Sequence, residues 1–226
     1  MQFFLDSAKL DEIQYAFRNW GIDGVTTNPR HIQVSGLTFR KAVDKIAAWV
    51  EDEGIAGWER FPVSVEIDPY IEEADKMVAA AKEISAISPN FVIKIPCTEQ
   101  GVIASRRLEA EGIRTNVTLV FSPSQAIAAG RNNALFVSPF VGWKEASGED
   151  CEPYIRRVVE IYRAQSYKTR VLVAALRNGK QIAEAAAMGA DIVTCGFQVY
   201  KDSFYHPFTD YGLDVFRKSW DATEKD

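Results

Sequence analysis

Residues 91–112 read FVIKIPCTEQGVIASRRLEAEG, a short apolar run followed at once by a longer segment with helical spacing. The run Phe91–Ile95 is rich in β-branched and aromatic residues, which is typical of a buried strand. The helical segment ends at Gly112, and glycine is the residue that helix C-termini favour. This stretch predicts one strand–helix unit, the building block of a parallel sheet.

The same unit recurs along the chain. The other short apolar runs are Phe3–Leu5, Gly24–Thr27, Val63–Glu66, Thr115–Leu119, Leu135–Ser138, Val171–Ala175 and Ile192–Cys195. The helical patterns are Lys9–Asn19, Phe39–Val50, Ile71–Ser85, Glu99–Glu111, Pro123–Gly130, Pro153–Gln165, Gly179–Met188 and Asp210–Thr223. Eight units predict an α/β fold, a single (β/α)₈ TIM barrel over residues 1–226 with an extra C-terminal helix in 210–226. The alternative is a doubly wound open sheet, although no glycine-rich nucleotide fingerprint is present.

Composition excludes several classes of protein. The chain has 226 residues, 47% hydrophobic and 25% charged, with a net charge of −5, which argues against disorder and against a nucleic-acid partner. No apolar run has the length of a membrane span, and the N-terminus lacks the pattern of a signal peptide. The three cysteines are widely spaced, which argues against a disulfide framework or a metal site. We expect a soluble, reduced, cytoplasmic protein with no membrane partner.

Polar residues stand at or just beyond the ends of six predicted strands. They are Asp6, Asn28, Glu66, Lys94, Thr118 and Ser138. Active sites of TIM barrels lie at the carboxyl ends of the strands, so these side chains are expected to share one site.

Lys94 carries the most specific chemistry of this set. Lysine is rarely buried unless it is paired or functional, and burial disfavours its ammonium form, which frees the amine to attack a carbonyl and form a Schiff base. Two carboxylates such as Asp6 and Glu66 can serve as acid and base, as proton carrier and orienter, or as metal ligands, and with Lys94 between them Schiff-base chemistry explains all three residues better than a metal does. The alternatives are a lysine that snorkels on the outer face, an Asp6 that caps the first helix, and an Asn28 that serves as a turn residue before proline.

Four short motifs, in the right order across nearly the whole chain, resemble those of the transaldolases and fructose-6-phosphate aldolases. They are Val25-Thr-Thr-Asn-Pro29, Val92-Ile-Lys-Ile-Pro96, Thr115-Asn-Val-Thr-Leu119 and Ser138-Pro-Phe-Val-Gly142. The resemblance implies a class I aldolase barrel that needs no metal or cofactor, because a protonated imine is itself an electron sink. It also implies a homo-oligomer, with two stacked pentamers as one form, in which the C-terminal helix takes part.

The resemblance also implies a role for each site residue. Lys94 forms the Schiff base with a ketose, and Asp6 exchanges a proton with the hydroxyl at the cleaved bond. Asn28 and Ser138 hold hydroxyls of the dihydroxyacetone unit, with Thr26 in the same substrate pocket, and Glu66 and Thr118 position a water. Glu66 and Phe140 resemble the transaldolase pattern, because the aldolases have Gln and Tyr at these two positions. Since Phe140 cannot donate a proton to the enamine, transfer is favoured over release.

The anion-binding positions depart from the family pattern. Trp143 stands where an arginine is usual, and Ala175 replaces the serine of a Ser-x-Arg motif whose Arg177 is kept. Arg30 and His31 stand where a small and an apolar residue are typical. One interpretation is ordinary phosphate binding through Arg177 and Lys144. The other is a pocket rebuilt to bind a sulfonate, with Arg30 and His31 at its rim and the Trp143 indole as a neutral donor.

Asn28-Pro-Arg-His31 and Val141-Gly-Trp-Lys144 resemble the small transaldolase-like enzymes that use 6-deoxy-6-sulfofructose. We therefore predict transfer of dihydroxyacetone from a ketose with a terminal anion, sulfofructose or fructose 6-phosphate, to an aldose phosphate such as glyceraldehyde 3-phosphate. The alternatives are an aldolase that releases free dihydroxyacetone and a catalytically silent barrel with a binding or assembly role.

Overall fold

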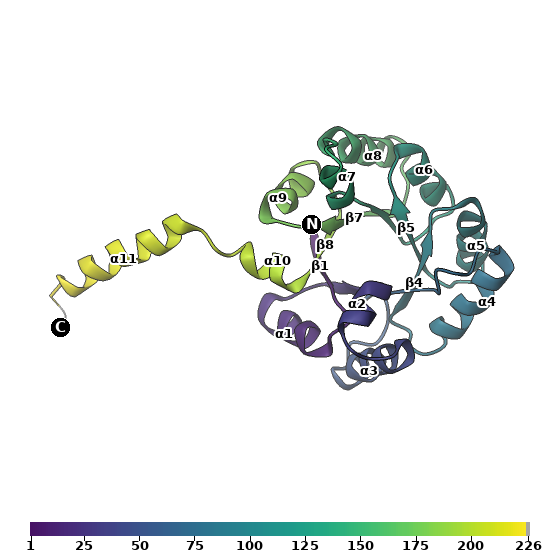
Figure 1. The fold of residues 1–226 in the computed structure, drawn as a ribbon, viewed down its shortest axis with the longest axis horizontal. Helices are drawn as coiled ribbons and strands as arrows, with labels where there is room; N and C mark the ends of the chain where they lie inside the picture. The colour runs from purple at the N-terminus through teal and green to yellow at the C-terminus, as the bar shows by residue number, and fades with distance from the viewer. Residues whose placement is uncertain (225–226) are drawn as a thin grey trace.

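Eight parallel strands close into a barrel in which β1 pairs with both β2 and β8 (Figure 1). The computed structural model describes residues 1–224. The strands are β1 (Gln2–Asp6), β2 (Gly24–Thr26), β3 (Val63–Glu66), β4 (Phe91–Pro96), β5 (Thr115–Val120), β6 (Phe136–Pro139), β7 (Arg170–Leu176) and β8 (Ile192–Cys195). The predicted (β/α)₈ barrel is confirmed, and closure excludes the open doubly wound sheet.

Eleven helices lie within residues 1–224. They are α1 (Leu10–Trp20), α2 (Pro29–Val34), α3 (Phe39–Asp52), α4 (Ala74–Ser85), α5 (Glu99–Ala110), α6 (Pro123–Arg131), α7 (Gly142–Ala146), α8 (Glu152–Ala164), α9 (Gly179–Ala187), α10 (Phe197–Asp202) and α11 (Pro207–Asp221). The short helices α2, α7 and α10 were not predicted. The predicted C-terminal helix begins earlier and ends earlier than expected, and positions 225 and 226 of the predicted segment lie outside the described residues.

Side chains at the carboxyl ends of the strands start several of the helices. Asn28, Thr98, Ser122 and Asn178 each accept a hydrogen bond from a backbone N–H in the first turn of the helix that follows. Such caps satisfy amide groups that have no partner within the helix. The turn from strand to helix is therefore specified locally at the end of the barrel that carries the predicted site.

The barrel interior has an apolar part and a polar part. Phe4, Val92, Phe136, Leu172 and Ile192 form one buried cluster, in which the rings of Phe4 and Phe136 meet edge to face at 5.6 Å. Farther along the strands the buried residues are polar, and they are Thr26, Ser64, Lys94, Asn116, Ser138 and Thr194. The apolar cluster thus fills the part of the barrel toward the amino ends of the strands, and the polar residues lie toward the carboxyl ends.

The last helix, α11, extends away from the barrel (Figure 1). It has no buried residue, and large apolar side chains on it are exposed, among them Phe208, Phe216 and Trp220. Trp20 of α1 stacks on Phe197 and Tyr200 of α10, with ring centroids 4.7 and 4.8 Å apart, and so holds the start of this extension against the barrel. None of the helices within residues 1–224 combines the length and apolar character of a membrane span.

Gly24 on β2 gives a direct test of the interior packing. A Cβ at this position would lie 2.7 Å from the Phe4 ring, closer than packed atoms approach. We expect Gly24→Ala to destabilise the fold by about 1–3 kcal/mol through overpacking, measured as a lower midpoint of thermal unfolding. Gly179→Ala is the control, because its Cβ meets Ser203 at an ordinary 3.5 Å. Equal midpoints for the two variants would contradict the packing described here.

Candidate active site

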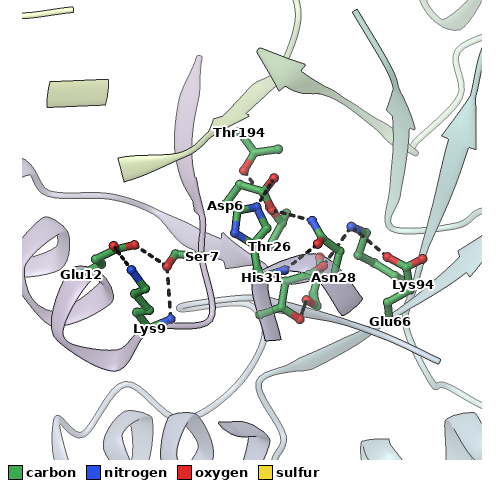
Figure 2. Close-up of polar contacts among 12 residues, drawn as sticks. Asp6, Ser7, Lys9, Glu12, Thr26, Asn28, His31, Glu66, Lys94 and Thr194 are labelled. Atoms are coloured by element: carbon green, nitrogen blue, oxygen red, sulfur yellow. Dashed lines mark hydrogen bonds and ion pairs between the residues drawn. The ribbon is translucent and has the colours of Figure 1, made fainter. Parts of the chain in front are cut away.

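Lys94 lies inside the barrel, on β4. Its side chain is almost fully buried, and Nζ donates a hydrogen bond to the carbonyl oxygen of Thr27 at 3.0 Å (Figure 2). Nζ also lies 3.4 Å from Oε2 of Glu66. Neighbouring residues Ile93 and Ile95 pack instead in the shell between the barrel and the helices, as strand alternation requires. The alternative of a lysine that snorkels on the outer face is therefore wrong.

Glu66 ends β3 and is in register with Lys94 on β4. Burial raises the pKa of Glu66 above its ordinary value, although the nearby Lys94 opposes this effect. A carboxyl with a raised pKa that contacts a lysine amine is suited to exchange protons with it.

Asp6 ends β1, and its side chain points into the barrel mouth (Figure 2). Oδ1 accepts from Thr26 Oγ1 at 2.8 Å and from Asn28 Nδ2 at 3.5 Å, and Oδ2 lies 3.0 Å from Nε2 of His31. The pKa of Asp6 is below its ordinary value. Burial raises it, but the hydrogen bond and charge of His31, the charge of Lys94 and the hydrogen bond from Thr26 outweigh burial. The first helix, α1, begins after Lys9 without a side-chain cap, so the alternative that Asp6 caps this helix is wrong.

Asn28 connects the site to the short helix α2. Its Oδ1 accepts from the backbone N–H of His31 at 3.0 Å, and Pro29 occupies the first helical position. The turn-residue alternative therefore describes part of its role, since Asn28 caps α2 while its amide group faces Asp6. This cap places Arg30 and His31 at the barrel mouth.

A chain of hydrogen bonds between side chains links β6, β5 and β3 inside the barrel. Ser138 Oγ donates to Asn116 Oδ1 at 2.7 Å, and Asn116 Nδ2 donates to Ser64 Oγ at 3.0 Å. All three side chains are buried. Since Ser138 gives its proton to Asn116, the lone pairs of Ser138 Oγ are left to accept a hydrogen bond from a substrate.

A cavity of about 580 Å³ lies at the mouth of the barrel. Its walls include eleven predicted site residues, which are Asp6, Thr26, Asn28, Arg30, His31, Glu66, Lys94, Ser138, Phe140, Trp143 and Arg177. Leu119 and Ala175 also line it, and both have left-handed backbone (φ 57° and 59°) where the registers of β5–β6 and β7–β8 shift. The strands therefore bend at the mouth on the side where Trp143 and Arg177 lie.

Two predicted residues do not line this cavity. Thr118 is buried two residues beyond Asn116 on β5, and its Oγ1 has no hydrogen-bond partner among residues 1–224. Lys144 pairs with Glu149 and lies over the ring of Tyr154, 5.4 Å from its centroid. The expected part of Lys144 in the anion pocket is therefore not supported by its position.

Sequence reasoning missed Asn116 and Thr194. Thr194 Oγ1 lies 2.7 Å from Thr26 Oγ1 and so supports the residue that holds Asp6. Both stand within predicted strands, and the only signal was their polar character in an otherwise apolar run. The pairing of His31 with Asp6 was also missed, because the two residues are far apart in sequence and the pairing depends on the cap of α2.

A closed (β/α)₈ barrel whose mouth holds a buried lysine and two carboxylates is the architecture of an enzyme. The model of the transaldolase/fructose-6-phosphate aldolase family matches residues 3–225, and the chain belongs to this family. It is 59% identical over 223 residues to the 6-deoxy-6-sulfo-D-fructose transaldolase of Priestia aryabhattai, covering 99% of this chain and 96% of the relative. The same figures hold for the protein of that name from Priestia megaterium. A probable transaldolase of Dictyoglomus turgidum is 40% identical, with all of both chains covered.

Asn116 is the residue on which the buried polar chain depends. We expect Asn116→Leu to lower the midpoint of thermal unfolding, because Ser64 and Ser138 lose their partner inside the barrel, at about 1–3 kcal/mol for each unsatisfied group. The double variant with Ser64→Ala should have a higher midpoint than Asn116→Leu alone, because it no longer leaves the Ser64 hydroxyl unsatisfied. Asn19→Leu, on the exposed side of α1, is the control. If Asn116→Leu unfolds at the temperature of Asn19→Leu, the chain does not stabilise the fold.

Proposed function

We propose that the protein is a Schiff-base transaldolase that moves a dihydroxyacetone unit from a ketose to an aldose phosphate. The observation that carries this proposal is the position of Lys94, buried in the barrel with Glu66 at 3.4 Å and with Asp6 in the same cavity. Membership of the transaldolase/fructose-6-phosphate aldolase family supports it.

In the first half-reaction the Lys94 amine attacks the ketose carbonyl, and loss of water gives a protonated imine. Glu66, whose pKa is raised, exchanges the protons of this step. The buried hydroxyl of Thr118 has no hydrogen-bond partner among residues 1–224, which supports the proposal that it holds a water together with Glu66. The Asp6 carboxylate then takes the proton of the hydroxyl on the second carbon from the imine, the carbon that becomes the carbonyl of the leaving aldehyde. The carbon–carbon bond breaks, its electron pair enters the imine to form an enamine, and an aldehyde leaves.

The second half-reaction is the reverse with another aldehyde. The enamine carbon attacks the acceptor carbonyl, Asp6 returns its proton to the new hydroxyl, and water releases the ketose from Lys94. Asn28 Nδ2 and the lone pairs of Ser138 Oγ are available for the dihydroxyacetone hydroxyls, since their other atoms are held by His31 and Asn116. Thr26 keeps Asp6 in place.

Phe140 favours transfer over release of free dihydroxyacetone. Its ring lies in the cavity wall, 5.5 Å from the rings of both Phe121 and Trp143. An apolar wall offers no proton to the enamine carbon, so the enamine waits for an acceptor aldehyde. The aldolase that releases dihydroxyacetone is the alternative reaction, and a silent barrel is the alternative class.

We infer that the donor is 6-deoxy-6-sulfofructose and the acceptor glyceraldehyde 3-phosphate, giving sulfolactaldehyde and fructose 6-phosphate. Two relatives that are 59% identical bear the name of that sulfosugar activity. The cations at the mouth are Arg30 and Arg177, neither of which makes an ion pair within residues 1–224, and Trp143 adds an indole N–H. A sulfonate monoanion needs less positive charge than a phosphate dianion, and Lys144 is paired elsewhere.

We also propose that the protein is a homo-oligomer of the cytoplasm. Helix α11 carries a row of exposed apolar side chains and projects from its own barrel (Figure 1). Patches of this kind mark association surfaces.

Removal of residues 207–226 should convert the oligomer to smaller species, measured by light scattering, and a full-length chain that is already monomeric would contradict the proposal. The three free thiols suit a reducing compartment.

The proposed reaction is tested by trapping. Borohydride with the ketose donor should attach the donor irreversibly to Lys94, identified by peptide mass. Lys94→Met should abolish trapping and lower transfer by on the order of 10⁴-fold or more, as for other lost nucleophiles. Lys168→Met, on an exposed position away from the cavity, should do neither. Trapping that persists in Lys94→Met would overturn the assignment.

The same purified protein is used to compare the two candidate donors and to distinguish transfer from release of free dihydroxyacetone. Sulfofructose and fructose 6-phosphate are each incubated with and without glyceraldehyde 3-phosphate, and the products are measured. Product that forms only with acceptor supports transfer, and free dihydroxyacetone without acceptor supports the aldolase. Ready transfer from fructose 6-phosphate with sulfofructose untouched would reject the sulfonate assignment.

A further inference from the structure

The two carboxylate oxygens of Asp6 have different surroundings. Oδ1 is held by Thr26 and Asn28, whereas His31 Nε2, at 3.0 Å, is the one partner of Oδ2 among residues 1–224 (Figure 2). The side chain of Asp6 is 17% exposed and that of His31 is 27% exposed. His31 therefore covers Asp6 from the side of the cavity mouth, and Oδ2 keeps one lone pair for another donor.

The backbone determines where the imidazole lies. The N–H of His31 donates to Asn28 Oδ1 at 3.0 Å, and the carbonyl of His31 accepts from the N–H of Ser35 at 3.0 Å. Asn28 thus holds both members of the pair, His31 through Oδ1 and Asp6 through Nδ2. The pair is built into the turn from β2 to α2.

We propose that His31 is a positioning residue for Asp6, donating from Nε2 to Oδ2 so that the carboxylate faces the hydroxyl at the bond to be cleaved. This role rests on the proposed function, in which Asp6 is the proton acceptor. It differs from the sequence-based expectation that His31 binds the donor's anion. An imidazole whose Nε2 is held by Asp6 has only Nδ1 left for an anion.

Electrostatics agrees with this geometry. Burial alone raises the pKa of Asp6, and the hydrogen bond and charge of His31 are the largest of the opposing causes. The other charged or titratable groups that face the pair are Glu66 on β3, Lys94 on β4, Cys195 on β8, Arg30 on α2 and Arg177 beyond β7. Loss of His31 should therefore move the pKa of Asp6 upward, toward the value that burial favours.

The test compares His31→Phe and His31→Gln with Gln33→Ala, an exposed residue of the same helix. Fructose, a ketose without an anion, is used as donor beside the anionic donor. We expect His31→Phe to lower kcat by about 10²-fold with both donors, within the range of general-base contributions. The acid limb of kcat/KM should move to higher pH, because a raised pKa leaves Asp6 protonated over more of the range. His31→Gln should recover about tenfold, since its amide N–H reaches a position similar to Nε2.

Two measurements distinguish a failure of the positioning role of His31 from a failure of the proposed function. Borohydride trapping on Lys94 needs no proton transfer to Asp6, so its yield should stay unchanged in His31→Phe, which also shows that the fold is intact. A raised KM for the anionic donor alone, with kcat and the pH profile unchanged, would overturn the positioning role and make His31 an anion ligand. Wild-type protein that traps no ketose would instead overturn the proposed function and with it the role of Asp6.

Discussion

The contact of the Lys94 amine with the Thr27 carbonyl and the Glu66 carboxylate is the constraint on which the rest of the site depends. A lysine inside a protein needs partners, because an unpaired buried charge is costly. Here the partners are Thr27, the residue directly after β2, and Glu66 at the end of β3, and these are the two strands before β4 in the barrel. In this closed barrel the amine has protein partners on one side and the cavity on the other.

The rest of the interior follows from that requirement. Each polar residue near Lys94 brings a need for a hydrogen bond, and the neighbouring strands supply it across the barrel. Asn116 links Ser64 and Ser138, and Thr26 links Asp6 and Thr194. Networks of this kind hold side chains in one geometry when every member is satisfied. Thr118 is the exception, because its buried hydroxyl has no hydrogen-bond partner among residues 1–224, and ordered water is the usual partner of such a group.

Hydrophobic period was enough to predict the barrel. Strand-end chemistry placed Asp6, Asn28, Glu66, Lys94 and Ser138 at its mouth, whereas the other predicted residues of the cavity wall came from the resemblance to family motifs. The short helices α2, α7 and α10 have five or six residues each, too few for a helical period to be visible in the sequence. Lys144 illustrates the consequence. It follows Trp143 directly, but adjacent residues of a helix face different directions, so once α7 forms only one of them reaches the cavity. The pairing of His31 with Asp6 is hidden for the same reason, since it needs α2.

The distribution of charge in the cavity is compatible with the anionic sugar proposed as substrate, although the chain as a whole is acidic. The net charge is −5, yet the arginines Arg30 and Arg177 stand exposed at the mouth while the two carboxylates lie deeper, held by Lys94, His31 and the threonines. An anion placed deep in the cavity would meet Asp6 and Glu66, whereas at the mouth it meets two guanidinium groups. In the proposed reaction this order of charges orients the ketose before any bond forms, with its anion outward and its carbonyl toward Lys94. Net charge describes the whole surface, and the order of charges along the cavity sets the direction in which the substrate enters.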